Sequence, residues 1–317
     1  MGRLVNSSFA AFDYRTKFGS RWFPSPIFTA SGCAGSGKEL AQFFALEELG
    51  AVVTKSIAIK ARSGRPTPRM AETPSGMLNS IGLQGPGIDQ FLEVDIPWLA
   101  SHGARTIVSI SGESVEEYAS LSRRLRGVSS ISGIEVNISC PNVENRGLVF
   151  ACDPVASKEV VQAVRRNLGG EFPIIVKLSP DVTDIVEIAR TVVEAGADGL
   201  ALINTVLGMV IDIDTQRPKL AGKTGGLSGP AIRPIAVRAI YQVHAALPQV
   251  PILGMGGVMS GRDALELVFA GASGISIGTA TFGNPAAVMK VKSELATLLK
   301  ERGFNSFLDA VGVAHER

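Results

Sequence analysis

The sequence predicts an α/β fold, a closed (β/α)8 TIM barrel with inserted loops, formed as a single domain by residues 1–317. Eight short apolar runs occur along the chain, and longer amphipathic stretches separate most of them. The runs are continuous in Val, Ile and Leu, which is typical of parallel strands covered on both faces. An open doubly wound sheet is the alternative, but such sheets rarely repeat strand and helix so regularly.

The expected strands follow one another in an even rhythm. They cover residues 25–32, 51–57, 106–112, 133–140, 173–180, 199–205, 251–257 and 274–279. Amphipathic stretches predict helices at residues 38–51, 114–127, 153–170, 181–197, 228–247, 260–272 and 284–303. The helix at 114–127 opens with a serine cap and an acidic first turn, and the one at 38–51 ends at a glycine. Asp181, Asp184 and Glu187 are interpreted as helix-start residues rather than an acid–base pair.

Two insertions interrupt this rhythm, and both follow expected strands. Residues 58–88 contain much Gly, Pro and Arg and little helical pattern. Residues 206–227 show an alternation that predicts a small hairpin. Both should rise from the face of the barrel on which active sites are built. No linker or composition shift marks a second domain, and so none is expected.

The composition excludes several classes of function. Apolar residues make up 45 % of the chain and charged residues 19 %, with a formal net charge of +2. A large core is therefore possible, and nucleic acid is a poor candidate partner. The three cysteines, Cys33, Cys140 and Cys152, lack the spacing of a disulfide framework, a metal site or an iron–sulfur cluster. No signal peptide or membrane span is evident, and so we expect a soluble, cytoplasmic protein without a bound metal.

Polar residues gather where the expected strands end. Any one of them is explained by a bond to a nearby loop, but together they predict a site for a planar, anionic, hydrogen-bonding ligand. The set contains Ser31, Lys55, Ser56, Ser109, Asn137, Cys140, Asn142, Lys177, Asn204, Thr205, Gly256, Gly257, Gly278 and Thr279.

The last two strand ends indicate a phosphate site. Glycine-rich turns at 254–257 and 276–279 precede expected helices, where free backbone N–H groups and the helix dipole bind phosphate. Simple tight turns are the alternative. Two strand-end lysines, Lys55 and Lys177, are compatible with two kinds of site. Such a lysine can stabilise an anionic reduced flavin, or it can form a Schiff base with a carbonyl substrate, as in a lyase. The amide-rich lining favours the flavin.

Several motifs in order resemble those of class 1 dihydroorotate dehydrogenases, from about residue 20 to residue 300. They are TASG at 29–32, VTKS at 53–56, RPTPRMAETPSGMLNSIGLQ at 65–84, NISCPN at 137–142, VKLSPDVTD at 176–184, INT at 203–205, GGLSGPAIRP at 225–234, GMGGV at 254–258 and IGT at 277–279. The NAD-linked subtype, class 1B, is the most similar. A dihydropyrimidine dehydrogenase-like flavoenzyme is a related alternative, but NSIGL and SCPN favour orotate.

The resemblance implies FMN-dependent oxidation of (S)-dihydroorotate to orotate in pyrimidine biosynthesis. Cys140 corresponds to the base that takes the C5 proton, while the C6 hydride goes to FMN. A thiol with a pKa of about 8.5 is partly ionised near neutral pH, which suits that role. FMN contacts are implied for Ser31, Lys55, Ser56, Ser109, Asn137, Lys177, Ile203, Gly229, Gly256, Gly257, Gly278 and Thr279. Substrate contacts are implied for Lys55, Asn79, Ser80, Ile81, Gly82, Leu83, Asn137, Asn142, Asn204 and Thr205.

The resemblance also implies partners. A class 1B catalytic chain forms a homodimer within a larger assembly and passes electrons to NAD through a subunit that carries FAD and an iron–sulfur cluster. Two positions depart from the family pattern: Ser109 stands where many members have asparagine, and Arg146 stands where glycine is expected. Cys33 and Cys152 are interpreted as ordinary small residues.

Overall fold

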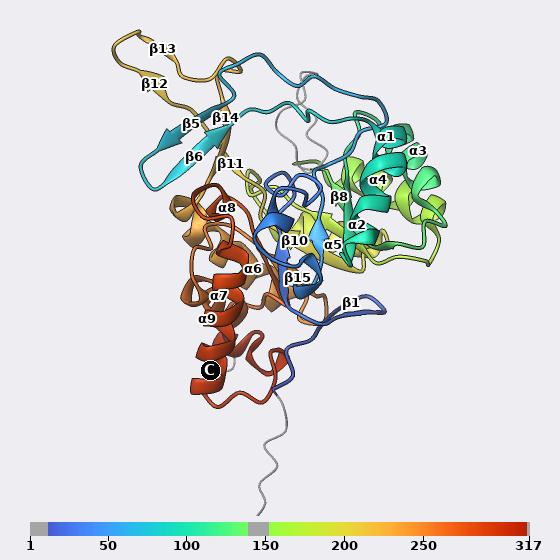
Figure 1. The fold of residues 1–317 in the computed structure, drawn as a ribbon, viewed down its shortest axis with the longest axis vertical. Helices are drawn as coiled ribbons and strands as arrows, with labels where there is room; N and C mark the ends of the chain where they lie inside the picture. The colour runs from blue at the N-terminus through green and yellow to red at the C-terminus, as the bar shows by residue number, and fades with distance from the viewer. Residues whose placement is uncertain (1–11, 139–151, 316–317) are drawn as a thin grey trace, which may run out of the picture.

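A computed structural model describes residues 12–138 and 152–315 of the chain. Its centre is an eight-stranded parallel sheet with the order β3-β16-β15-β10-β9-β8-β7-β4. A parallel bridge between Phe28 and Ala51 joins the two ends of this order, so the sheet closes. The predicted (β/α)8 barrel is therefore confirmed (Figure 1). The barrel strands are β3 (Ile27–Thr29), β4 (Val52–Val53), β7 (Thr106–Ile110), β8 (Ile131–Asn137), β9 (Ile174–Lys177), β10 (Gly199–Leu202), β15 (Ile252–Gly254) and β16 (Gly274–Ile277).

Helices surround the barrel, most of them where amphipathic patterns predict them. These are α3 (Val115–Leu125), α4 (Pro154–Leu168), α5 (Ile185–Glu194), α6 (Arg233–Ala246), α7 (Gly261–Phe269) and α9 (Ala287–Glu301). The shorter turns are α8 (Ala280–Gly283), η5 (Pro230–Ile232), η6 (Leu308–Ala310) and η7 (Val313–His315). Ser114 caps α3 by accepting a bond from the Glu117 N–H, and Asp184 caps α5. Asp181 is not a cap, because its carboxylate accepts the backbone N–H of Leu207 in the second insertion.

The helix expected at 38–51 does not form. Two 3-10 turns take its place, η1 (Leu40–Gln42) and η2 (Leu46–Glu48), separated by extended backbone at Ala45. Leu40 and Leu46 are both buried. One continuous α-helix would place two residues six apart about 120° from each other around its axis. The break at Ala45 therefore lets both side chains reach the core.

A helical segment that the sequence pattern did not reveal lies between β4 and β7. It consists of α1 (Ile88–Gln90), the π-helical turn η3 (Phe91–Asp95) and α2 (Ile96–Ser101). Its buried residues, Ile88, Phe91, Ile96 and Leu99, are spaced by three, five and three positions. The wider π turn accommodates the five-residue step, which is why the usual 3.6-residue period is hidden.

The two insertions pair with each other above the barrel (Figure 1). Four antiparallel strands form one sheet in the order β11-β14-β6-β5: β5 (Met70–Thr73), β6 (Gly76–Asn79), β11 (Val206–Gly208) and β14 (Gly225–Ser228). The small hairpin predicted in 206–227 is confirmed as β12 (Ile211–Asp212) with β13 (Arg217–Pro218). The shared sheet places both insertions over the same barrel end.

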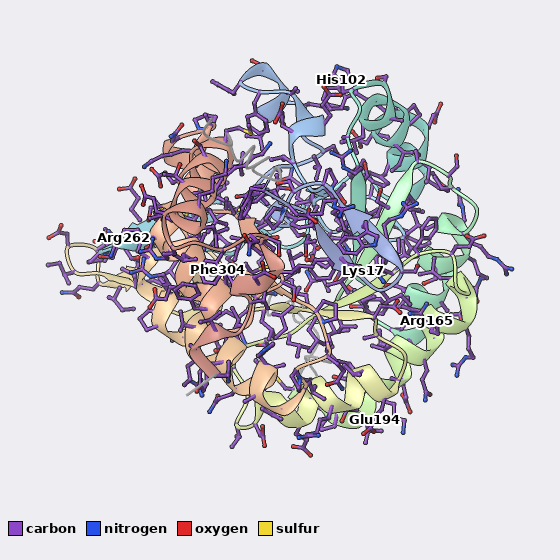
Figure 2. All side chains as sticks on the ribbon, turned by 90° about the horizontal axis from the view of Figure 1, so that it is seen from below. Lys17, His102, Arg165, Glu194, Arg262 and Phe304 are labelled. Carbon is purple, nitrogen blue, oxygen red and sulfur yellow. The ribbon has the colours of Figure 1, made fainter. Side chains whose placement is uncertain are left out.

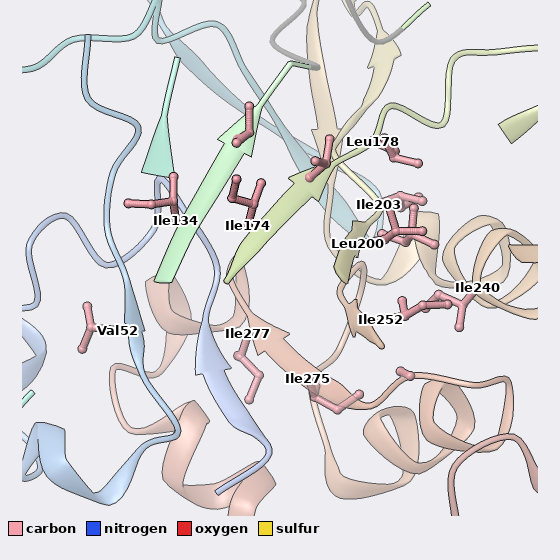
Figure 3. Close-up of a cluster of buried hydrophobic side chains, with 14 of the residues drawn as sticks. Val52, Ile134, Ile174, Leu178, Leu200, Ile203, Ile240, Ile252, Ile275 and Ile277 are labelled. Atoms are coloured by element: carbon pink, nitrogen blue, oxygen red, sulfur yellow. The ribbon is translucent and has the colours of Figure 1, made fainter. Parts of the chain in front are cut away.

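An aromatic plug fills the opposite end of the barrel. The hairpin of β1 (Thr16–Phe18) and β2 (Arg21–Phe23) crosses this end, and Lys17 lies near the centre of the ring of helices when seen from below (Figure 2). Phe18, Phe23 and Phe28 are fully buried and pack edge to face, with ring centroids 5.3–6.1 Å apart. Side chains that point outward from the strands meet the helices in a second, larger cluster (Figure 3). Together these layers hold the strand ends in fixed positions.

Within residues 12–138 and 152–315, no helix is long and apolar enough to cross a membrane.

Candidate active site

A cavity of about 310 Å³ opens at the carboxyl end of the barrel, between the strand ends and the sheet formed by the insertions. Most residues predicted for the site line it: Ser31, Lys55, Ser56, Asn79, Ile81, Gly82, Leu83, Asn137, Lys177, Ile203, Asn204, Thr205, Gly229, Gly256, Gly257, Gly278 and Thr279. The barrel brings these residues together from distant parts of the chain. Cys140, Asn142 and Arg146 lie outside the residues that the structure describes.

Ser80 and Ser109 do not line the cavity. Both side chains are fully buried behind its wall. The Ser80 hydroxyl accepts a bond from Arg65 Nη1 at 3.0 Å, within the first insertion. The Ser109 hydroxyl lies in the barrel interior, 2.9 Å from Ser56 Oγ. Either serine can therefore affect a ligand only through its neighbours.

Ser56 is the centre of a hydrogen-bond network on the cavity floor. Its Oγ lies 3.2 Å from Ser31 Oγ and accepts a bond from Asn137 Nδ2 at 3.0 Å. Ser56 and Ser31 belong to loops that follow β4 and β3, whereas Asn137 ends β8. Closure of the barrel thus aligns three polar side chains that lie up to 106 positions apart in the chain. The network fixes hydroxyl and amide groups at the base of the cavity.

Positive charge is concentrated on the same floor. Lys177 lies at the end of β9, and its Nζ is 4.0 Å from the fully buried carboxylate of Glu135. Lys55 lines the cavity from the loop after β4. Cys33 also lines it, and burial raises the pKa of its thiol despite the opposing charges of Lys177 and Lys55. The cavity therefore presents two ammonium groups beside a neutral thiol.

The rim near β15 and β16 consists of close-packed glycine backbone. Gly256 and Gly257 have φ angles of +127° and +73°, a region that favours glycine. A Cβ on Gly257 would lie 2.8 Å from Arg233 Cβ and 2.9 Å from the Gly229 carbonyl oxygen. A side chain at Gly257 therefore has no room, and Gly256 and Gly257 line the cavity with backbone alone. Such a rim suits a ligand group that binds to peptide N–H groups, above all a phosphate.

The sheet of the insertions forms the roof of the cavity. Asn79 Nδ2 donates to the Gly226 carbonyl oxygen at 3.3 Å, which joins β6 to β14. A Cβ on Gly226 would lie only 2.0 Å from Thr205 Oγ1, so Thr205 packs directly against this strand. The side-chain oxygen of Asn204 accepts the backbone N–H of Thr205 at 2.9 Å. Amide and hydroxyl groups from the roof and from the adjoining end of β10 therefore line the same cavity as the lysines.

Some lining residues were missed by sequence reasoning. Ser276 is buried on β16, and its hydroxyl has no hydrogen-bond partner among the described residues. It precedes Gly278 by two positions on a strand, and this alternation could have identified it. Ser228, which accepts a 2.8 Å bond from Thr279 Oγ1, lies within the GGLSGPAIRP motif. Met70, Met77, Met255, Met259, Ile232 and Phe282 supply apolar surface that no local pattern marks.

Comparisons with known proteins agree with this geometry. The family described as Dihydroorotate dehydrogenase matches residues 14–299. A protein of Geobacter sp. (strain M21), described as "Dihydroorotate dehydrogenase B (NAD(+)), catalytic subunit", is 48 % identical over 288 residues, covering 91 % of this chain and 93 % of that protein. Proteins with the same description from Desulforudis audaxviator and Pelobacter propionicus are 48 % and 49 % identical, covering 92 % and 91 % of this chain and 94 % of each relative. The chain belongs to the dihydroorotate dehydrogenase family.

Proposed function

We propose that this protein oxidises (S)-dihydroorotate to orotate in pyrimidine biosynthesis, as the FMN-carrying catalytic chain of an NAD-linked dihydroorotate dehydrogenase. The observation that carries the proposal is that both lysines, the amide side chains and the glycine rim line the same cavity. Family membership and the description of the relatives support the same reaction.

The residues present fit FMN. The glycine rim at Gly256 and Gly257 offers peptide groups to a phosphate, and the orphaned Ser276 hydroxyl offers a polar partner inside the cavity. Ser31, Ser56, Asn137 and Lys177 lie on the floor, where a flat ring edge needs donors and positive charge. Ile203, Gly229, Gly278 and Thr279 complete this half of the cavity. The donor set therefore matches a phosphorylated, planar and partly anionic group.

The substrate is assigned to the half of the cavity beneath the roof. Asn79, Asn204 and Thr205 provide amide and hydroxyl partners for the polar ring of dihydroorotate. The backbone at 81–83 closes this side, and Lys55 lies where it can attract the substrate carboxylate. FMN, when bound, would accept the hydride from C6 of the substrate. Lys177 supplies positive charge on the floor, where negative charge arises during turnover.

Cys140 is proposed as the base that removes the C5 proton. It follows Ile138, the last residue described before the gap, by two positions. A thiol titrates close enough to neutral pH to act as a base, whereas a serine hydroxyl does not. Asn142 is proposed as a further substrate contact from the same segment. Ser80 and Ser109, which do not line the cavity, are assigned indirect roles.

We propose that electrons leave through a partner. The relatives are named as a catalytic subunit of an NAD(+) enzyme, which supports a second polypeptide. The resemblance to class 1B enzymes implies that this subunit carries FAD and an iron–sulfur cluster, and the spacing of the three cysteines in this chain matches no cluster. A homodimer within a larger cytoplasmic assembly completes the proposal.

Purification and spectroscopy test the proposal. The purified protein should show the absorbance of an oxidised flavin, and anaerobic dihydroorotate should bleach it. 5,6-Dihydrouracil, which lacks the carboxylate, serves as the matched substrate and should bleach it far more slowly. A colourless protein in which borohydride traps a carbonyl compound on Lys177 would establish the Schiff-base lyase instead. Faster bleaching by dihydrouracil would indicate a dihydropyrimidine dehydrogenase-like flavoenzyme instead.

A further inference from the structure

A buried carboxylate lies directly beneath the cavity and has no role in the mechanism above. Glu135 stands in the middle of β8, and its side chain has no exposed surface. Ser109 on β7 and Lys177 on β9 flank it. Two positions before these neighbours stand Ile107 and Ile175, which belong to the aromatic and aliphatic plug of the barrel. Glu135 therefore occupies the layer between a dry apolar plug and the cavity floor.

The contacts that stabilise this carboxylate are made to one of its two oxygens. Its Oε1 accepts the Ser109 hydroxyl at 2.9 Å and lies 4.0 Å from Lys177 Nζ. Its Oε2 has no hydrogen-bond partner in the part of the chain that the structure describes. A carboxylate placed against apolar side chains is costly unless a positive charge lies nearby. Lys177 is the positive charge at hand, so the two groups form a buried pair.

The same carboxylate is linked to the cavity by hydroxyl groups. Ser109 donates to Glu135, so its oxygen is available to the Ser56 hydroxyl at 2.9 Å. Ser56 in turn contacts Ser31 and Asn137, both of which line the cavity. Glu135 is thus connected to the floor along two routes, directly through Lys177 and indirectly through Ser109 and Ser56.

We propose that Glu135 is a positioning residue that holds Lys177 and sets the net charge beneath the flavin, and that Ser109 fixes the orientation of Glu135. The proposal rests on the proposed flavin site. Lys177 alone would favour the reduced, more negative flavin, which raises its reduction potential. A carboxylate 4.0 Å from the ammonium group cancels part of this effect and keeps the potential lower.

Anaerobic reduction of the purified protein against a reference dye, which reports the reduction potential of the bound flavin, tests this inference. Glu135→Gln preserves the size of the side chain and removes its charge. In this variant the equilibrium should favour the reduced flavin about tenfold more than in the unaltered protein. This corresponds to a rise of about 30 mV in the reduction potential of a two-electron couple. Lys177→Met should shift the potential in the opposite direction. Glu301→Gln, at the exposed end of α9, removes the same charge far from the floor and should leave the potential unchanged.

Ser109→Ala provides a second route if Glu135→Gln does not fold. Without the Ser109 bond the carboxylate can turn away from Lys177, so the potential should rise, by less than in Glu135→Gln. A purely structural role would lower thermal stability or loosen the flavin while leaving the potential unchanged, and that result in either variant would overturn the inference. Failure of the proposed function is distinct, since the unaltered protein would then lack flavin or would not be bleached by dihydroorotate.

Discussion

Replacement of Gly226 by alanine should weaken substrate binding through one steric contact. Gly226 lies on β14 in the roof, and an added Cβ would stand 2.0 Å from Thr205 Oγ1 and 2.6 Å from Thr205 Cβ. Ordinary contacts to a Cβ begin near 3.4 Å, so Thr205 or the strand must move by about 1 Å or more. The backbone of Gly226 needs no positive φ, and the clash is therefore the whole perturbation.

The size of the effect follows from this displacement. Loss of one buried hydrogen bond to the substrate costs about 1–3 kcal/mol, which corresponds to a weakening of orotate binding by about 5- to 150-fold. Overpacking of the roof costs a further amount of about 1–3 kcal/mol in stability. An unfolding entropy of about 2.1 cal/mol/K per residue over 317 residues gives about 0.7 kcal/mol/K. The melting temperature should therefore fall by about 1.5–4.5 °C.

Titration of orotate, followed by the absorbance of the bound flavin, measures the first effect, and thermal unfolding measures the second. Flavin content should change little, because the clash is with Thr205, whereas Gly256 and Gly257 of the rim follow β15. Gly170→Ala is the matched control, since a Cβ there meets nothing within 4 Å and should alter neither measurement. Unchanged orotate affinity in Gly226→Ala would refute the placement of Thr205 at the substrate.

Three further predictions concern the base, the acceptor and acid stability. Cys140→Ser should retain FMN and orotate but lose more than about 100-fold in turnover at neutral pH, with partial recovery at high pH; unaltered steady-state rates at neutral pH would remove Cys140 from the role of base. The isolated chain should reduce artificial dyes with dihydroorotate yet barely reduce NAD⁺. Efficient NAD⁺ reduction by a homogeneous preparation would contradict electron transfer through a partner subunit, and efficient fumarate reduction would assign the protein to the other class 1 subtype. Burial, followed by the charge of His315, lowers the pKa of His244 below its usual 6.5. The unfolded chain therefore binds the proton more readily, and the stability contributed by neutral His244 is lost as the pH falls from about 6.5 toward the lowered pKa. Between about pH 7.5 and pH 5.5, the melting temperature of His244→Leu should fall less than that of the unaltered protein. Equal falls would show that His244 does not cause the loss of stability at low pH.

The sequence alone predicted the barrel and most of the cavity wall. Parallel strands covered on both faces must be continuously apolar, so runs such as 173–180 and 199–205 indicated both the strands and their direction. Since all strand ends of a parallel barrel meet at one face, Lys177, Asn137 and Asn204 could be assigned to one site without knowledge of the structure. Their convergence in one cavity follows from topology rather than from local detail.

Local patterns failed where distant segments determine the conformation. The helix expected at 38–51 is broken because Leu40 and Leu46 must both reach the core, and the π turn at Phe91–Asp95 hides the period of the helix that was missed. The sheet shared by the two insertions joins β6 to β14, which lie far apart in the chain. No periodicity within either insertion specifies that pairing.

Glu135 illustrates the same limit within the site. In the sequence it is one charged residue inside an apolar run, and only the closed barrel shows that it lies between Ser109 and Lys177. Ser80 was assigned to the site by motif and Ser109 by its place at an expected strand end, yet the fold buries both hydroxyls behind the cavity wall. The position of a residue along its strand decides which end of the barrel its side chain occupies. Burial and charge pairing depend on neighbours from other strands, and only the tertiary structure brings those neighbours together.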